Sequence, residues 1–86
     1  MGRITVRFSE EFSESKTAKI VYGLLKKRGL EPVKVLATYL PPDKLGEVEY
    51  FFENKTILPR ESELEEILVG TKFASVEVFG LTGAAG

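Results

Sequence analysis

The stretch that decides the fold is residues 48–59, which read VEYFFENKTILP. Its first five residues have the composition and period-two alternation of a strand, with Val48, Tyr50 and Phe52 on one face. We expect this face to pack in the core. The opposite face carries Glu47, Glu49, Phe51 and Glu53. That acidic face would repel phosphate, so the aromatic residues of this strand are predicted to serve packing rather than RNA stacking.

A hairpin and a short helix are predicted to follow this strand. Asn54-Lys55 indicates a tight turn, because Asn tolerates a positive φ better than most residues do. Residues 56–58 are then the returning strand, which a proline ends. Ser62 and Glu65 stand in the spacing of a capping box, which predicts a helix of about two turns that ends at Gly70.

The last predicted strand is residues 73–79, FASVEVF. Alternation places Ala74, Val76 and Val78 on one side, which we assign to the core. The other side carries Phe73, Ser75, Glu77 and Phe79. This assignment leaves two phenylalanine rings on the outer face of the sheet.

The N-terminal half adds three elements to this pattern. The alternating run RITVRF predicts a first strand with Ile4, Val6 and Phe8 inward and Arg3, Thr5 and Arg7 outward. An apolar stripe at helical spacing predicts a helix from Ser13 to Arg28, with Gly29 as its C-terminal residue. Residues 33–40 are rich in β-branched and aromatic residues and predict a further strand.

Composition restricts the class of protein. The chain has 86 residues, 43% hydrophobic residues, a net charge of −1 and neither Cys nor His. A chain of this size forms one domain, so we expect a single α+β domain over residues 1–79 and a flexible C-terminal tail over residues 80–86. Without His and Cys, most general bases, thiolate nucleophiles and zinc sites are excluded, and we predict no enzyme, no cofactor and no metal site.

The net charge and the hydropathy pattern exclude two kinds of partner and indicate a location. A net charge of −1 lacks the basic footprint of a nucleic-acid-binding protein, so no nucleic-acid partner is predicted. No apolar run approaches the length of a membrane span, and we expect a soluble, cytoplasmic protein that does not bind membranes. The scarcity of Asn and Gln, with 29% charged residues, favours a heat-adapted source.

The outer face of the predicted sheet is the candidate binding surface. Apolar rings at its centre and charges around them are typical of surfaces that bind a partner protein. The residues assigned to this surface are Phe51, Phe73, Phe79, Arg3, Arg7 and Glu77.

The C-terminal half contains a recognisable order of features. The run Asn54-Lys55-Thr56-Ile57-Leu58-Pro59-Arg60-Glu61, a last strand containing Val76-Glu77-Val78-Phe79 and a small-residue tail follow one another. This order resembles the C-terminal half of the ThiS/MoaD sulfur carriers, which are ubiquitin-like β-grasp proteins. The resemblance covers residues 48–86, with a looser match of the first strand and helix.

The resemblance implies a carrier rather than a catalyst. In that family an activating enzyme adenylates the C-terminal carboxylate with ATP, and the carboxylate is then converted to a thiocarboxylate. Gly86 corresponds to the acceptor position, and Gly83, Ala84 and Ala85 correspond to the thin tail. The partners implied are the activating enzyme and a sulfur or conjugation acceptor protein. The family ends in Gly-Gly, whereas this chain ends in Ala85-Gly86.

Two folds and two functions remain open at this point. The family places a strand hairpin before the helix, whereas the element order without the resemblance is the ferredoxin-like βαββαβ. That alternative predicts Arg3 and Arg7 beside Glu47, Glu49 and Glu53 on the open face. The function is either a ubiquitin-like carrier or modifier, or a non-catalytic homo-oligomeric interaction module, such as a homodimer, with an apolar sheet face.

Overall fold

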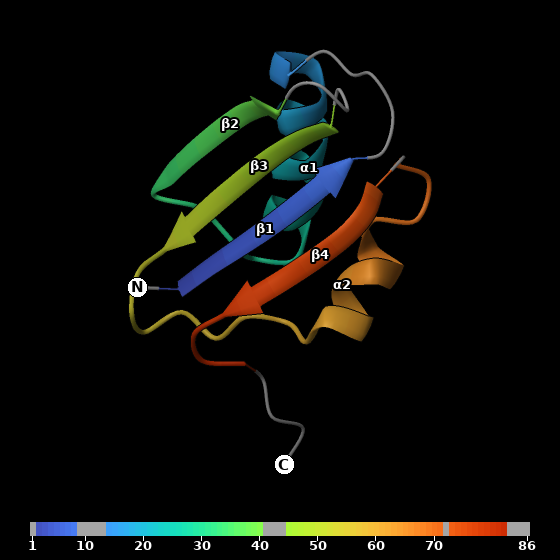
Figure 1. Ribbon diagram of the computed structural model, residues 1–86. Coiled ribbons are helices and arrows are strands. Elements are labelled where there is room, and N and C mark those ends of the chain that lie inside the picture. Colours follow the sequence, from blue (N-terminus) through green and yellow to red (C-terminus); the bar gives the residue numbers. More distant parts are fainter. Residues whose placement is uncertain (1, 9–13, 41–44, 72, 83–86) are drawn as a thin grey trace.

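A computed structural model describes residues 2–8, 14–40, 45–71 and 73–82. They form an α+β fold with one open, four-stranded antiparallel sheet and two helices (Figure 1). The elements are β1 (Gly2–Phe8), α1 (Glu14–Lys27), β2 (Lys34–Leu40), β3 (Leu45–Phe52), α2 (Glu61–Ile67) and β4 (Phe73–Phe79). The strands lie in the order β2-β3-β1-β4, so β1 and β3 are central and β2 and β4 form the edges. Neither helix in the described residues is long and apolar enough to cross a membrane.

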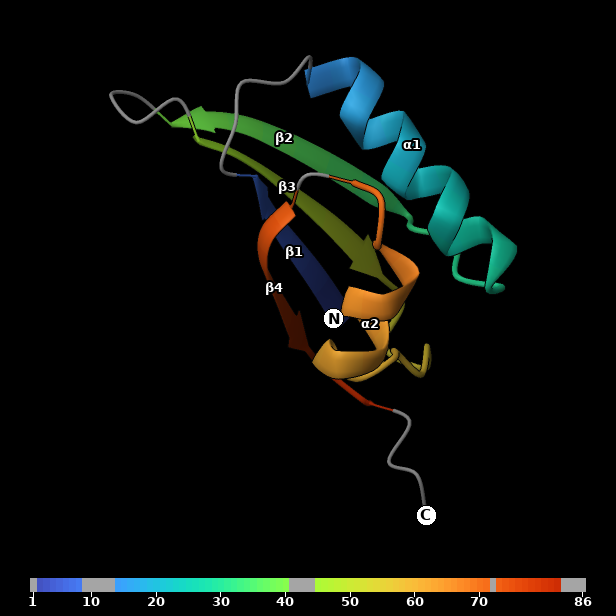
Figure 2. The ribbon, with the colours of Figure 1, turned by 90° about the vertical axis from the view of Figure 1, so that its right-hand side faces the viewer.

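Both helices lie on the same face of the sheet, and the opposite face is open (Figure 2). The strands alternate as the sequence predicts: Ile4, Val6 and Phe8 of β1 face the helices and are buried with Val48, Tyr50 and Phe52 of β3. Helix α1 contributes Val21 and Leu25 to this core, and α2 contributes Leu64 and Ile67. Burial of this apolar face supplies most of the free energy that holds the helices to the sheet.

One polar group enters the core. The Tyr50 hydroxyl donates a hydrogen bond of 3.0 Å to the backbone carbonyl oxygen of Ala18 on α1, which fixes the helix over β3. Burial raises the pKa of Tyr50 above its usual value, because the phenolate would lose its hydration there.

The pairing register matches an expectation from the sequence. β1 and β2 both run antiparallel to β3, so they run in the same direction on either side of it, and α1 is the crossover between them. Arg7 lies opposite Glu47, and Arg3 lies diagonally from Glu49, two residues along the neighbouring strand, as predicted for the βαββαβ order. Glu53 follows the end of β3 and is outside this register.

The predicted hairpin around Asn54-Lys55 is wrong in its second half. The turn forms, with the Thr56 N–H donating to the Glu53 carbonyl oxygen at 3.0 Å, but residues 56–58 form no strand with β3. β3 already pairs with β1 on one side and β2 on the other, so neither of its edges can accept a returning strand. Leu58 instead forms an isolated parallel bridge with Thr82.

The capping box predicted for α2 is also wrong. The helix begins at Glu61, and its N-cap is Arg60, which makes no side-chain capping hydrogen bond. Ser62 therefore lies within the first turn. In the first turn, the Leu64 N–H donates to the Arg60 carbonyl oxygen at 2.8 Å. A helix that starts at this residue places Leu64 on its buried face. Gly70, with φ of 98°, follows the helix end, close to the predicted position.

The bounds predicted for β4 are confirmed, but its facing is wrong at the first two residues. The β1–β4 register shifts between Arg7 and Phe8, so Phe8 lies opposite Phe73. This bulge turns Phe73 towards the core, against which it packs half-buried, and leaves Ala74 exposed. Strict alternation could not anticipate the extra residue.

Candidate functional site

The open face of the sheet is the candidate functional site. One line of four residues crosses it from edge to edge, because Lys34 lies opposite Phe51, Phe51 opposite Arg3, and Arg3 opposite Phe79. Cations and aromatic rings thus alternate across all four strands. We call Lys34, Phe51, Arg3 and Phe79 the cation–aromatic row.

Short distances connect the members of this row. Arg3 Cζ lies 4.5 Å from the centre of the Phe79 ring, and Lys34 Nζ lies 5.8 Å from the centre of the Phe51 ring. Both distances are within the range of cation–π attraction. Phe79 is 43% exposed and Phe51 is half-buried, so part of each ring's apolar surface can meet a partner.

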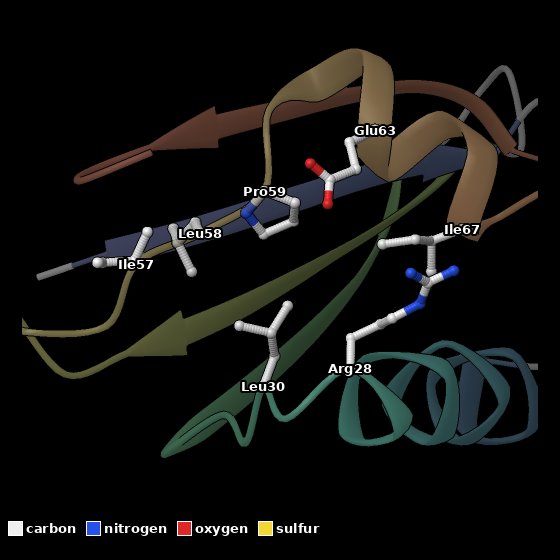
Figure 3. A pocket seen from close by; sticks show the side chains of 7 residues that line it. All are labelled: Arg28, Leu30, Ile57, Leu58, Pro59, Glu63 and Ile67. Carbon is white, nitrogen blue, oxygen red and sulfur yellow. The ribbon is translucent and has the colours of Figure 1, made fainter. Parts of the chain in front are cut away.

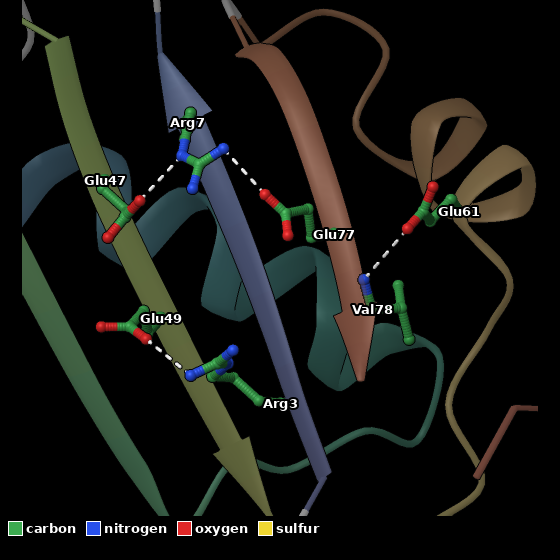
Figure 4. A network of polar contacts seen from close by, with 7 residues as sticks. All are labelled: Arg3, Arg7, Glu47, Glu49, Glu61, Glu77 and Val78. Carbon is green, nitrogen blue, oxygen red and sulfur yellow. Dashed lines mark hydrogen bonds and ion pairs between the residues drawn. The ribbon is translucent and has the colours of Figure 1, made fainter. Parts of the chain in front are cut away.

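A second line of contacts surrounds Arg7, nearer the other end of the strands (Figure 4). The Arg7 Nε–H donates to Glu47 Oε1 at 2.8 Å, and Arg7 Nη1 lies 2.7 Å from Glu77 Oε1. The hydrogen bond to Glu47, and then the charge of Glu77, raise the pKa of Arg7 above its usual value. One guanidinium therefore bridges β3, β1 and β4.

A third ion pair lies between these two lines. Arg3 Nη1 lies 3.4 Å from Glu49 Oε2, while the Arg3 Nε is buried without a hydrogen-bond partner among the described residues. The Arg3 guanidinium also lies over the Phe79 ring, so cation–π attraction adds to its ion pair with Glu49.

Among the described residues, the charges of the open face balance. The cations are Lys34, Arg3 and Arg7, and the carboxylates are Glu47, Glu49 and Glu77. Equal numbers of both signs give no net attraction for the phosphate backbone of a nucleic acid. Alternating charges around exposed rings fit the surface of another protein better.

Most of the residues predicted for a partner surface do meet on this face. Arg3, Arg7, Phe51, Glu77 and Phe79 lie together there, whereas Phe73 lies on the core side because of the bulge. Lys34 was not among the residues predicted for this surface. Alternation along residues 33–40 puts Lys34 on the same face as Leu36 and Thr38, but only the pairing of β2 with β3 shows that this is the open face.

Gly83, Ala84, Ala85 and Gly86, the predicted tail and acceptor, lie outside the described residues. The residues just before them are held to the body of the protein. The Leu58 N–H donates to the Leu81 carbonyl oxygen at 2.7 Å, and Leu58 also bridges to Thr82. Gly80 makes the bend after β4 with φ of 122°, where an added Cβ would lie 3.0 Å from Gly2 Cα.

A cavity of about 300 Å³ opens on the other side of the molecule, between the end of α1 and α2 (Figure 3). Its floor is formed by the buried side chains of Leu30, Leu58 and Ile67, and its rim carries Arg28 and Glu63. One arginine and one glutamate at the rim of an apolar cavity do not make up the set of groups that acid–base or nucleophilic catalysis needs. In the described part of the chain, no group of acidic residues is arranged to hold a metal ion.

Comparison with known proteins finds no family model, no curated protein and no solved structure that matches the chain. The resemblance of residues 48–86 to sulfur carriers therefore stays a prediction from the sequence.

Proposed function

We propose that this chain is a non-catalytic interaction module that associates with further copies of itself through the open face of its sheet. The observation that carries the proposal is the cation–aromatic row, in which one exposed and one half-buried ring alternate with cations on a face that neither helix covers. A second copy laid on this face would bury the rings of Phe51 and Phe79 and offer carboxylates to the cations.

The balance of charge supports a second copy as the occupant of this face. Because both signs occur in equal number, two copies related by a two-fold axis can place cations of one over carboxylates of the other. The absence of His and Cys from the whole sequence favours binding over catalysis.

For the fold that carries this face, we propose the ferredoxin-like βαββαβ arrangement. It is supported by the element order and by the pairing of Arg7 with Glu47 across β1 and β3. The β-grasp alternative places a strand hairpin between the first strand and the helix. Only residues 9–13 separate β1 from α1, which is scarcely enough chain for that second strand.

The self-association proposal is tested by measuring the solution mass as a function of protein concentration, by light scattering. We expect the wild-type mass to rise above that of one chain and Phe79→Glu to lower it, because the carboxylate would replace an exposed ring. Val69→Glu is the matched control, since Val69 is also exposed but follows α2. A wild-type protein that stays monomeric, or a Phe79→Glu mass equal to that of wild type, contradicts the proposal.

One specific observation favours a second candidate function, the carrier. The run that resembles the sulfur carriers contains Leu58, whose backbone N–H donates to the Leu81 carbonyl oxygen, so this run anchors the beginning of the tail predicted over residues 80–86. On this hypothesis Gly86 is activated by an ATP-using enzyme and passes sulfur to an acceptor protein.

The carrier hypothesis is tested by intact mass spectrometry after incubation with ATP, a sulfur donor and the activating enzyme of the source. Replacement of one terminal oxygen by sulfur, lost when Gly86 is deleted, is the expected result. A chain that remains unmodified under these conditions contradicts the hypothesis.

A further inference from the structure

The two edges of the sheet are treated differently by the rest of the chain. β4 is covered at one of its outward amides, because Glu61 Oε2 accepts a hydrogen bond of 3.4 Å from the Val78 N–H. A bulge and the bend at Gly80 further interrupt the β4 edge. Both devices are typical of edges that are protected from pairing with another strand.

β2 shows no comparable protection among its described side chains. The strand pairs with β3 on one side only, so alternate N–H and C=O groups point away from the sheet along the other side. Every side chain from residue 33 to residue 38 is exposed, including those of Val33, Val35 and Leu36. Within residues 33–38 there is no proline and no acidic residue, and Lys34 carries the single charge.

We infer that β2 is a pairing edge for β2 of a second copy, which joins the two sheets into one continuous antiparallel sheet. The inference rests on the proposed self-association and names a second contact that supports it. Edge pairing leaves both open faces uncovered on the same side of the joined sheet, so it does not compete with contacts through the cation–aromatic row.

The sequence of β2 allows the strand to pair with its own copy about a two-fold axis at Leu36. Two antiparallel copies of a strand related by a two-fold axis must place one residue opposite its own copy, because the outward backbone groups belong to alternate residues. With Leu36 at the axis, Val35 lies opposite Ala37 of the second copy and Lys34 lies opposite Thr38. A register centred on Lys34 would instead oppose two like charges.

In this register the open faces of the two copies lie on the same side of the joined sheet, and the faces covered by α1 lie on the other side. Leu36 lies on the open face, opposite Glu49 of β3, whereas Val35 lies on the face that α1 covers. The apolar contacts at the axis would therefore form on both faces of the joined sheet. Because α1 packs over β2, the two copies of α1 would come side by side on the covered face.

The experiment uses charge at the two-fold axis, with the mass measured by sedimentation equilibrium on the full chain. We expect Leu36→Lys and Leu36→Glu each to lower the mass relative to wild type, since each opposes two like charges across the axis. An equimolar mixture of the two variants should recover the lost association, because the axis then pairs opposite charges. Val69→Lys is the control and should leave the mass unchanged.

A second measurement separates edge pairing from contacts of the open face. Amide hydrogen exchange of alternate residues between 34 and 38 should slow as the protein concentration rises, since pairing covers these amides directly. Phe79→Glu should not remove this protection. Failure of the mixture to associate, or exchange in β2 that is independent of concentration, overturns edge pairing even where wild-type protein associates.

A monomeric wild-type protein overturns both edge pairing and the proposed function. Association that is lost in Phe79→Glu and unchanged in both Leu36 variants overturns edge pairing alone and leaves the open-face proposal standing.

Discussion

On the covered face of the sheet, Val6 of β1 lies opposite Val48 of β3, and one residue along the same strands Arg7 lies opposite Glu47 on the open face. The first pair is fully buried, whereas the Arg7 side chain is 44% exposed. The covered face stabilises the fold by removing apolar surface from water. Exposed ion pairs contribute little to stability, so the ion pairs of the open face add less to the fold than the buried face does.

The largest expected loss of stability comes from a substitution on the covered face, compared with the same substitution on the open face. Phe52 and Phe51 are neighbours in β3, but Phe52 is fully buried and Phe51 lies on the open face. Phe52→Ala should lower the free energy of unfolding by about 3–5 kcal/mol through lost burial and a cavity. Phe51→Ala should lower it by about 1 kcal/mol or less. Urea denaturation measures both, and equal losses would contradict the comparison.

A smaller effect concerns the polar group in the covered face. Tyr50→Phe removes the hydrogen bond to the Ala18 carbonyl oxygen and should lower the free energy of unfolding by about 1 kcal/mol. Tyr22→Phe is the control, because the Tyr22 side chain is only half-buried.

The pH dependence sharpens this test. The pKa of Tyr50 is raised in the folded state, so the unfolded state, with a pKa of about 10, releases its proton first as the pH rises. The contribution of Tyr50 to the free energy of unfolding is therefore constant below about pH 10 and declines above it. Tyr50→Phe should reduce this alkaline decline, and a decline of unchanged slope in the variant contradicts the assignment.

The smallest expected effect concerns Arg7. Arg7→Met keeps an apolar stem but removes the contacts to Glu47 and Glu77, and should change the free energy of unfolding by less than about 1 kcal/mol. The difference from wild type should shrink when salt is added, because exposed charges are screened. Thermal unfolding at low and high salt measures it. If Arg7→Met lowered the free energy of unfolding as much as Phe52→Ala does, the ion pairs of the open face would be a main source of stability, which contradicts the comparison.

Alternation along the chain predicted the strands β1 and β4 and the buried face of β3 correctly, and the content of β-branched and aromatic residues predicted β2. It succeeded because residues such as Ile4 and Tyr50 are sorted by burial with a period of two, which is a local property. The same reasoning predicted that Arg3, Arg7, Phe51 and Phe79 share a face. Their neighbours across the sheet followed only from the order of the strands.

The errors share a physical cause. Residues 56–58 have the composition of a strand, but the two edges of β3 pair with β2, which precedes it in the sequence, and with β1, which lies far away. Alternation along β4 predicted Phe73 on the outer face, but the register shift between Arg7 and Phe8 places it opposite Phe8 on the core side. The start of α2 was fixed by the burial of Leu64 rather than by a cap at Ser62. Each outcome depends on tertiary contacts that no local pattern contains.

The central position of β1 has a consequence for folding kinetics. β1 pairs with β3 and with β4, and the second pairing closes the longest loop in the sheet. Because closing long loops costs chain entropy, we expect β2, β3 and β1 to assemble before β4 docks. Val76→Ala in β4 should then accelerate unfolding and leave the refolding rate nearly unchanged in stopped-flow experiments. A refolding rate that falls in proportion to stability would place β4 in the folding nucleus instead.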